Sequence, residues 1–210
     1  FLVVREAEAQ LNLVLDGTAD ALEAVTPISN ISRVMAQPAL RIVTVPSFIV
    51  GYLLFNQRAY GDRSRPHPIL ADPEVRRAIT LAIDRQKILR ATFGPSAAPA
   101  EGPIGLAPWI RREAPKAPGH DPQGARAILT RRGWVDRDGD GLLEREGGPL
   151  LLRLNYPGTN ALRVAIAPQV QEMLRQVGIR LELVRLDGPV WAERRNKGEF
   201  DVDFSSASLD

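Results

Sequence analysis

The stretch DPEVRRAITLAIDR, residues 72–85, carries the clearest structural signal in the sequence. Asp72 suits the N-cap of a helix, and Pro73 suits its first turn, where the missing N–H of proline costs nothing. Apolar residues then recur at helical spacing and form one stripe: Val75, Ala78, Ile79, Ala82 and Ile83. We expect a helix over this stretch, with Asp84 beginning a second, short helix that ends at residues 94–95.

Strand and helix signals alternate on both sides of this stretch. Apolar or β-branched runs predict strands at residues 1–4, 41–45, 50–55, 150–154, 179–183 and from 200 onward, the one at 50–55 buried on both faces. Helical spacing predicts helices at residues 7–15, 121–133, 166–177 and 191–197. Asp121 and Pro122 repeat the cap and proline of the first stretch, and Pro168 either opens its helix or kinks an earlier turn. Such alternation predicts an α/β fold in which helices flank a mixed β-sheet.

Composition narrows the classes of protein to which the chain can belong. Its 210 residues are 44% hydrophobic and 25% charged, and no apolar run reaches the length of a membrane span. The absence of cysteine excludes a disulfide framework, a thiolate zinc site and a cysteine nucleophile. All basic residues except Lys87, Lys116 and Lys197 are arginine, but they are interleaved with acidic residues, which favours solvated ion pairs over a phosphate or nucleic-acid surface.

Residues 136–141, Asp-Arg-Asp-Gly-Asp-Gly, match the first six positions of a calcium-binding loop. Asp136, Asp138 and Asp140 would supply the oxygen ligands. The twelfth position, where a bidentate Glu is required, is Gly147. The alternative is a polar hairpin turn without metal, since Asp and Gly both favour turn geometry.

The long segment 95–118, rich in Pro, Ala and Gly, is expected to be an irregular surface excursion, with a disordered linker as the alternative.

No residue pattern nominates an enzyme reaction or a cofactor. The only histidines, His67 and His120, stand beside or near prolines in loop-like sequence, and we expect both to be solvated. Asp201 and Asp203 alternate along a predicted strand, so they would share a face, and an exposed edge strand is the simplest explanation for them. We therefore expect no catalytic activity and no cofactor.

Several motifs occur in one order along the chain. They are LLFN at residues 53–56, PILADPEVRRAI at 68–79, AIDR at 82–85, GW at 133–134, GI at 178–179 and GEFD at 198–201, with LDG at 15–17 and Asp20 upstream. This order resembles the extracellular solute-binding proteins of ABC transporters, family 5, the oligopeptide- and dipeptide-binding type. The resemblance covers almost the whole chain and implies one lobe, residues 1–210, of a two-lobed periplasmic-binding-protein type II fold, so that the chain is expected to be a piece of a longer protein.

The resemblance also implies a function and candidate site residues. Such proteins close two lobes on a peptide and deliver it to a membrane permease, working as monomers in the periplasm or anchored outside the membrane, without nucleic acid. Asp210 stands where the family's aspartate holds the amino terminus of the ligand, with a loop-capping Asp as the alternative. Trp191 resembles a pocket aromatic, with a core anchor as the alternative, and Arg195 is a candidate for a ligand carboxylate. Tyr156 and Asn160 belong to a candidate rim, because ligands of such sheets lie beyond strand ends.

Three other functions stay open on the sequence. The solute could be a sugar or a nickel chelate instead of a peptide. The lobe could belong to a sensor in which the binding domain is fused to a regulatory module. The weakest alternative is an interaction domain stabilised by calcium at residues 136–141.

Overall fold

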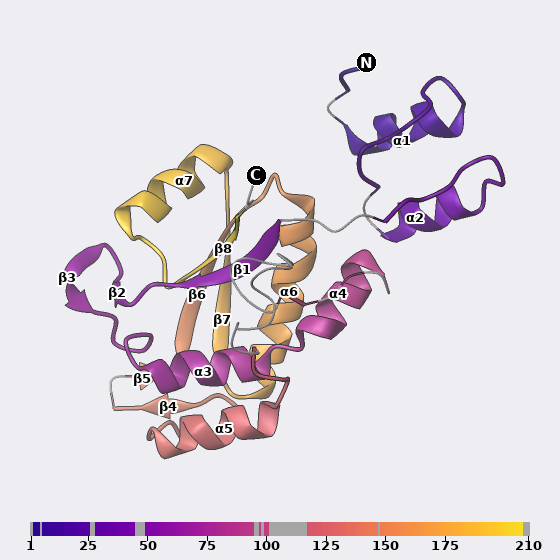
Figure 1. The fold of residues 1–210 in the computed structure, drawn as a ribbon. Coiled ribbons are helices and arrows are strands. Elements are labelled where there is room, and N and C mark those ends of the chain that lie inside the picture. The colour runs from indigo at the N-terminus through magenta and orange to yellow at the C-terminus, as the bar shows by residue number, and fades with distance from the viewer. Residues whose placement is uncertain are drawn as a thin grey trace, which may run out of the picture. The chain divides into compact units, whose positions relative to one another are not determined.

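The structure, a computed structural model, describes residues 2–4, 6–25, 28–44, 49–94, 97, 99–100, 117–146 and 148–207. The chain divides into two compact units (Figure 1). The first unit comprises Phe1–Pro46 and Gln86–Pro99, and the second comprises Ser47–Arg85 and Ala100–Asp210. Most of the irregular excursion expected at 95–118 lies outside the described residues.

The first unit is helical in its described part. It contains α1 (Ala7–Leu15), α2 (Ile28–Met35) and, apart from its first residue, α4 (Arg85–Phe93). Leu11 of α1 and Val34 of α2 are buried. Glu8 ties the two helices together, because its carboxylate accepts hydrogen bonds from Asn30 Nδ2 at 2.8 Å and Arg33 Nη1 at 2.7 Å.

The strands predicted at residues 1–4 and 41–45 are wrong wherever the structure describes them. Residues 2–4 and 41–44 lie in no strand, and α2 forms where the sequence pattern predicted nothing. A strand needs a neighbour that takes up its backbone N–H and C=O groups. Within the described part of the first unit no other strand is present, so these β-branched runs have nothing to pair with.

The second unit is built on a four-stranded mixed sheet with the order β1-β8-β6-β7. Its strands are β1 (Val50–Phe55), β8 (Val202–Ala207), β6 (Leu151–Pro157) and β7 (Arg180–Leu186). β1 runs antiparallel to β8, whereas β6 is parallel to both β7 and β8. The predicted α/β class with a mixed sheet is confirmed. The expectation that β1 is buried on both faces is wrong, because β1 is an edge strand and Leu54 is 36% exposed.

α3 (Pro73–Ala82) and α5 (Pro122–Arg131) confirm the capping signals in the sequence. Asp72 Oδ1 accepts a hydrogen bond from Glu74 N at 2.9 Å, and Asp121 Oδ1 accepts one from Gly124 N at 2.8 Å. Each cap satisfies a backbone donor that the first helical turn leaves free. The apolar stripe of α3 is buried as expected, and Arg132 Nε reaches back from the end of α5 to Asp72 Oδ2 at 2.6 Å.

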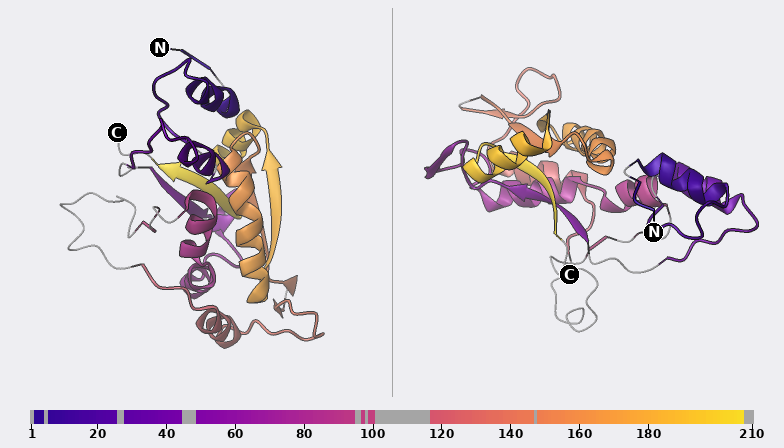
Figure 2. Two further views of the ribbon diagram at one scale, coloured as in Figure 1. Left: turned by 90° about the vertical axis from the view of Figure 1, so that its right-hand side faces the viewer. Right: turned by 90° about the horizontal axis from the view of Figure 1, so that it is seen from above.

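α6 (Ala161–Gln176) joins β6 to β7, and α7 (Gly188–Lys197) joins β7 to β8. The two helices lie on opposite faces of the sheet (Figures 1 and 2). Both begin earlier than the apolar spacing predicted, α6 because Asn160 caps it and accepts a hydrogen bond from Arg163 N at 3.0 Å. Pro168 is therefore an interior residue of α6, with its side chain exposed. The sheet thus lies between two crossover helices. These helices cover its faces and leave the carboxyl ends of its parallel strands accessible at one edge.

Two short hairpins complete the second unit. β2 (Arg58–Ala59) pairs with β3 (Asp62–Pro66), and β4 (Glu144–Arg145) pairs with β5 (Gly148–Pro149). In the described part of the chain, no helix is long and apolar enough to cross a lipid bilayer.

Candidate functional site

The carboxyl ends of β6, β7 and β8 lie at one edge of the sheet, which we call the carboxyl edge. β6 pairs with β7 along its whole length, but with β8 only at Leu154↔Val202 and Asn155↔Asp203. No further residue of β6 is paired with β8. In open α/β sheets, ligands bind outside the carboxyl ends of strands at the point where the connections change sides. α6 leaves this edge after β6 and α7 leaves it after β7, and the two helices lie on opposite faces, so the connections change sides at this edge (Figure 2).

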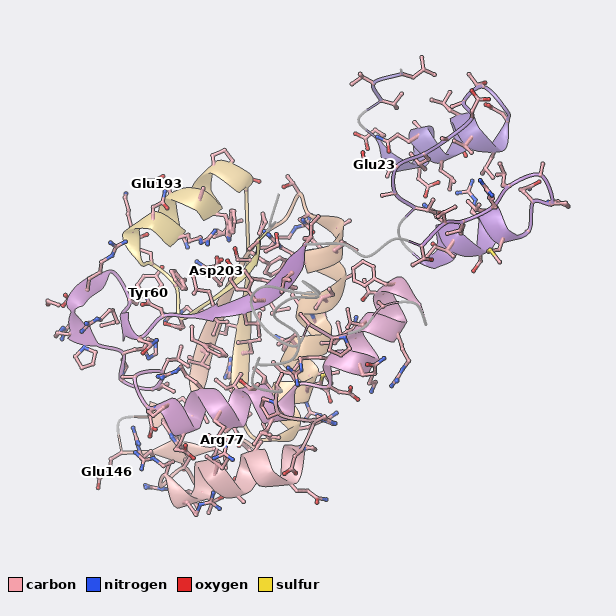
Figure 3. The ribbon with its side chains drawn as sticks, viewed as in Figure 1. Glu23, Tyr60, Arg77, Glu146, Glu193 and Asp203 are labelled. Carbon is pink, nitrogen blue, oxygen red and sulfur yellow. The ribbon has the colours of Figure 1, made fainter. Side chains whose placement is uncertain are left out.

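Asp203 is the central residue of this edge. Its side chain is fully buried and points toward α7 (Figure 3), where Trp191 Nε1 donates a hydrogen bond to Asp203 Oδ2 at 2.6 Å. Its other oxygen, Oδ1, has no hydrogen-bond partner among the described residues, although Arg195 Nε lies 3.8 Å away. Burial raises the pKa of the Asp203 carboxyl, while the Trp191 N–H and the charges of Arg195 and Arg163 act in the lowering direction.

Arg163 brings a second guanidinium to the same place from the first turn of α6. Its guanidinium carbon lies 5.1 Å from the ring centroid of Trp191 and 5.9 Å from that of Phe204. The guanidinium carbon of Arg195 lies 5.5 Å from the Trp191 centroid. Arg163 Nη2 also donates a hydrogen bond to Ser206 Oγ at 3.1 Å. The edge therefore combines two aromatic rings, two cations and one buried carboxylate, a set suited to orienting a polar ligand.

The structure brings some of the sequence-predicted site residues together. Trp191 and Arg195 both contact Asp203, and Asn160 holds the backbone of Arg163 through its cap. Tyr156 is 6% exposed and lies on the same face of β6 as the buried Leu152 and Leu154, so its side chain belongs to the core. Asp210 lies outside the described residues.

Asp203 and Arg163 are the residues that the sequence pattern did not find. Asp203 was explained by an exposed edge strand, and this is wrong, because β8 lies between β1 and β6 and both Asp201 and Asp203 are buried. The alternating acids in an otherwise apolar strand were the available signal. Arg163 has no comparable signal, since it is one arginine among many and its place beside Trp191 depends on the tertiary fold.

Asp201 organises the opposite, amino-terminal edge of the sheet. Its Oδ1 lies 3.2 Å from His67 Nε2, and its Oδ2 accepts a hydrogen bond from Arg153 N at 2.8 Å. His67 Nδ1 accepts hydrogen bonds from the backbone N–H groups of Ile69 and Leu70, so Nε2 carries the proton that points to Asp201. The expectation of a solvated His67 is wrong, because the side chain is 5% exposed and forms part of the scaffold.

A cavity of about 320 Å³ opens beside this His67–Asp201 pair. Tyr60, between β2 and β3, contributes to its wall (Figure 3). Arg153 lines the cavity too, with its guanidinium carbon 5.5 Å from the Tyr60 centroid. His67 and Asp201 at the base of the cavity already bond each other, and the two arginines that line it, Arg65 and Arg153, pair with Asp62 and Glu182.

The other histidine, His120, is more exposed than His67, and its Nδ1 lies 3.8 Å from Asp84 Oδ2.

The acidic turn at residues 136–141 closes the bridge between Val135 and Glu144, as the hairpin alternative predicted. Oxygens of Asp136, Asp138 and Asp140 approach one another within 4.8 Å. These carboxylates accept hydrogen bonds from backbone N–H groups of the turn itself, including Gly139 N and Gly141 N to Asp136. The hydrogen bonds account for the turn without a metal, and calcium binding there stays a prediction.

Comparisons with known proteins agree with this architecture. A family model described as bacterial extracellular solute-binding proteins, family 5 Middle, matches residues 1–210. The oligopeptide-binding protein AppA of Bacillus subtilis is 28% identical over 167 residues, which cover 78% of this chain and 29% of that protein. The chain therefore spans less than a third of the length of this relative. The structure of AppA with a nonapeptide superposes with a TM-score of 0.78 at 25% identity, covering 99% of this chain and 40% of AppA.

Two further solved structures share the fold. NikA from Brucella suis, in complex with Fe(III)-EDTA, has a TM-score of 0.83 at 21% identity and covers 97% of this chain and 40% of its own. MelB from Agrobacterium fabrum, in complex with stachyose, has a TM-score of 0.78 at 24% identity and covers 98% of this chain and 33% of its own. These relatives bind a peptide, a metal chelate and a sugar on one architecture.

Proposed function

The chain belongs to the bacterial extracellular solute-binding proteins of family 5, and we propose that residues 1–210 form one lobe of a two-lobed protein that closes on a peptide. The bound peptide would be delivered to the permease of an ABC transporter, by a monomer in the periplasm or anchored outside the membrane, without nucleic acid. The role is binding rather than catalysis. Closure of two lobes around a ligand is a hinge motion, and the chain crossings between lobes would form the hinge.

The observation that supports this function most is the polar cluster at the carboxyl edge. Trp191, Arg195, Arg163 and Asp203 converge there, at the place where α/β sheets bind ligands. A peptide bound at this edge would contact an aromatic surface, and its charged groups would find hydrogen-bonding partners there. Asp210, three residues beyond the end of β8, stays the proposed partner of the peptide amino terminus, and Asn160 a proposed rim residue.

Peptide is proposed over sugar or metal chelate because relatives that match 78% and 97% of this chain are named as oligopeptide- and di/tripeptide-binding proteins. The test is a thermal-shift screen of the full-length protein against a random tripeptide library, stachyose and Fe(III)-EDTA. A ligand that binds only the folded state raises the melting temperature, and the rise grows with the logarithm of the ligand concentration divided by its Kd. We expect stabilisation by peptides. Stabilisation by stachyose or the chelate alone would replace the peptide assignment.

A further inference from the structure

We infer that Asp203 is a positioning residue that holds helix α7 against the sheet and so keeps Trp191 and Arg195 in place at the carboxyl edge. Asp203 is fully buried and would not touch the solute, so it acts through α7. For the use of Trp191 and Arg195 in binding, this inference rests on the proposed function. Three features support it: the shallow packing of α7, the unequal bonds along the helix and the charges around Asp203.

α7 packs less deeply than helices α3, α5 and α6 of the second unit. In α7, all of whose residues are described, no side chain is buried, whereas each of the other three helices buries three or more. A helix of ten residues is too short to be stable in water by itself, so tertiary contacts must hold it. Because α7 has little apolar packing, its polar contacts decide where it lies.

The C-terminal end of α7 is fixed by several hydrogen bonds. The carbonyl oxygen of Gly198, which follows the helix, accepts from Asn56 Nδ2 at 3.0 Å and from Gly61 N at 3.1 Å. Arg63 of the β2–β3 hairpin donates to the carbonyl oxygen of Asn196. These donors satisfy carbonyl groups that the last turn of a helix leaves free. This end of α7 therefore stays attached without Asp203.

The first two turns of α7 meet the sheet through Asp203. Trp191 Nε1 donates to Asp203 Oδ2 at 2.6 Å, and Arg195 Nε lies 3.8 Å from Asp203 Oδ1. Among the described residues, these are the side chains of α7 that hydrogen-bond or ion-pair outside their own helix, and both meet the same carboxylate. Positions 191 and 195 are one helical turn apart, so they face β8 from the same side of α7.

Asp203 also separates two like charges. The guanidinium carbons of Arg163 and Arg195 lie 5.1 and 5.5 Å from the centroid of the Trp191 ring. Burial lowers the pKa of Arg163, and the charge of Arg195 acts in the same direction, whereas Asp203 opposes both. Without the carboxylate, α7 would hold one cation close to another on α6. Loss of Asp203 should therefore break a hydrogen bond and add a repulsion between the two helices.

The experiment measures amide hydrogen exchange in the full-length protein without ligand, by mass spectrometry. In D203A, the amides in the first two turns of α7 should exchange about ten- to a hundredfold faster than in the wild type, because a charged hydrogen bond is lost. Exchange in β6 and α3 should keep its wild-type rate. D203N keeps an oxygen that accepts from the Trp191 N–H but lacks the charge, so it should fall between them. W191F added to D203A should change little further, since both remove the same bond.

The matched control is V202A. Val202 is the buried neighbour of Asp203 in β8, and consecutive strand residues face opposite sides of the sheet, so Val202 points away from α7. V202A should lower the unfolding free energy by leaving a cavity, yet α7 should exchange at the wild-type rate. The inference is overturned if α7 of D203A exchanges at the wild-type rate, if V202A speeds α7 as much as D203A does, or if D203A speeds the whole second unit equally.

Ligand affinity, measured by calorimetry, separates this role from the proposed function. The probes are the random tripeptide library, stachyose and Fe(III)-EDTA, and each one that binds the wild type is titrated into the variants. We expect D203A to weaken binding about tenfold, because Trp191 and Arg195 are no longer held in place, and V202A to keep the wild-type affinity. Unchanged affinity in D203A would overturn the positioning role. If no probe binds the wild type, the proposed function fails, and the exchange of α7 alone decides whether Asp203 holds the helix.

Discussion

Asp201 and Asp203 stand two residues apart, are both buried, and differ in how their oxygens are satisfied. Asp201 uses both carboxylate oxygens, one facing His67 Nε2 and one accepting from Arg153 N, while its backbone carbonyl accepts from Asn56 N at 2.9 Å. Asp203 has one hydrogen bond, from Trp191, and a buried oxygen left without one among the described residues. A buried carboxylate therefore has both oxygens hydrogen-bonded at the amino-terminal edge of the sheet, but only one at the carboxyl edge.

This difference separates a hydrogen-bond network that stabilises the second unit, around Asp201, from a cluster with unused bonding capacity, around Asp203. Fully satisfied buried networks fix a fold, whereas a partly satisfied buried group is costly and persists where something else needs it. The Asp201 network joins the segment after β3 to the starts of β6 and β8. The Asp203 cluster joins α6 and α7 at the carboxyl edge, where the proposed ligand would enter.

The largest expected effect comes from D201A in the full-length protein. The substitution removes the acceptors of His67 Nε2 and of the Arg153 N–H, both in buried or partly buried positions. Two orphaned donors, each costing about 1–3 kcal/mol, predict a loss of about 3–5 kcal/mol in the free energy of unfolding. Urea denaturation would measure it. A loss below about 1 kcal/mol would show that Asp201 is no more important to the scaffold than Asp203.

A double-mutant cycle of H67A and D201A isolates the bond between the two side chains. Because each residue orphans the other when removed, the double variant should be less destabilised than the sum of the single variants. We expect a coupling energy of about 1–3 kcal/mol. The same cycle between H67A and D203N should give a coupling near zero, since Asp203 bonds Trp191 instead. Equal couplings in the two cycles would contradict the separation of the two edges.

W191F tests the single hydrogen bond of Asp203. Phenylalanine keeps an aromatic ring for Arg163 and Arg195 but has no N–H for Asp203 Oδ2. We expect a loss of about 1 kcal/mol in unfolding free energy, because one buried acceptor loses its donor. Peptide affinity should fall more clearly than stability. A loss as large as that of D201A would place Trp191 among the scaffold residues, which was the alternative drawn from the sequence.

The smallest effect should come from D203N, with a characteristic dependence on pH. Burial raises the pKa of Asp203 above its ordinary value of 3.8, with Trp191, Arg195 and Arg163 opposing, and Tyr52 of β1 also near the cluster. Between the unfolded and folded pKa values the folded state binds more protons, so the stability of the wild type falls as pH rises through this window. D203N lacks this titration.

At neutral pH, D203N should therefore change the unfolding free energy by less than about 1 kcal/mol, because the lost attraction to the arginines offsets the lower desolvation cost. Below the ordinary pKa of 3.8 the variant should be less stable relative to the wild type than at neutral pH. Denaturation curves of both proteins at several pH values would measure the difference. A difference that moves in the opposite direction would mean that the arginines outweigh burial.

The sequence predicted those parts of the fold that depend on local chemistry. Asp72 and Asp121 cap their helices as expected, and the stripe of α3 is buried, because capping and helical spacing involve residues a few positions apart. The strand at 41–45 was wrong for its described residues because pairing is decided by a distant partner. The extra length of α6 was missed because its first turn is capped by Asn160 rather than marked by apolar spacing.

The candidate site was harder to predict than the fold. Trp191 and Arg195 were proposed through a family resemblance, and the structure places both beside Asp203, while their role in ligand binding stays a prediction. His67 and Asp203 were misjudged because burial of a polar residue depends on strand order, which places β8 in the interior of the sheet. No spacing rule in the sequence reports where the pairing of β6 with β8 stops, or that Arg163 of α6 lies beside Trp191 of α7.

The pairing of β1 with β8 has a mechanical consequence. Val50, where β1 begins, lies opposite Ala207, where β8 ends, so both ends of this antiparallel pair leave the sheet side by side. A force that pulls on these two ends would load the hydrogen bonds between the strands one after another, like a zip, instead of shearing them all together. Stretched between optical traps through these two points, the second unit should open at low force and in successive steps.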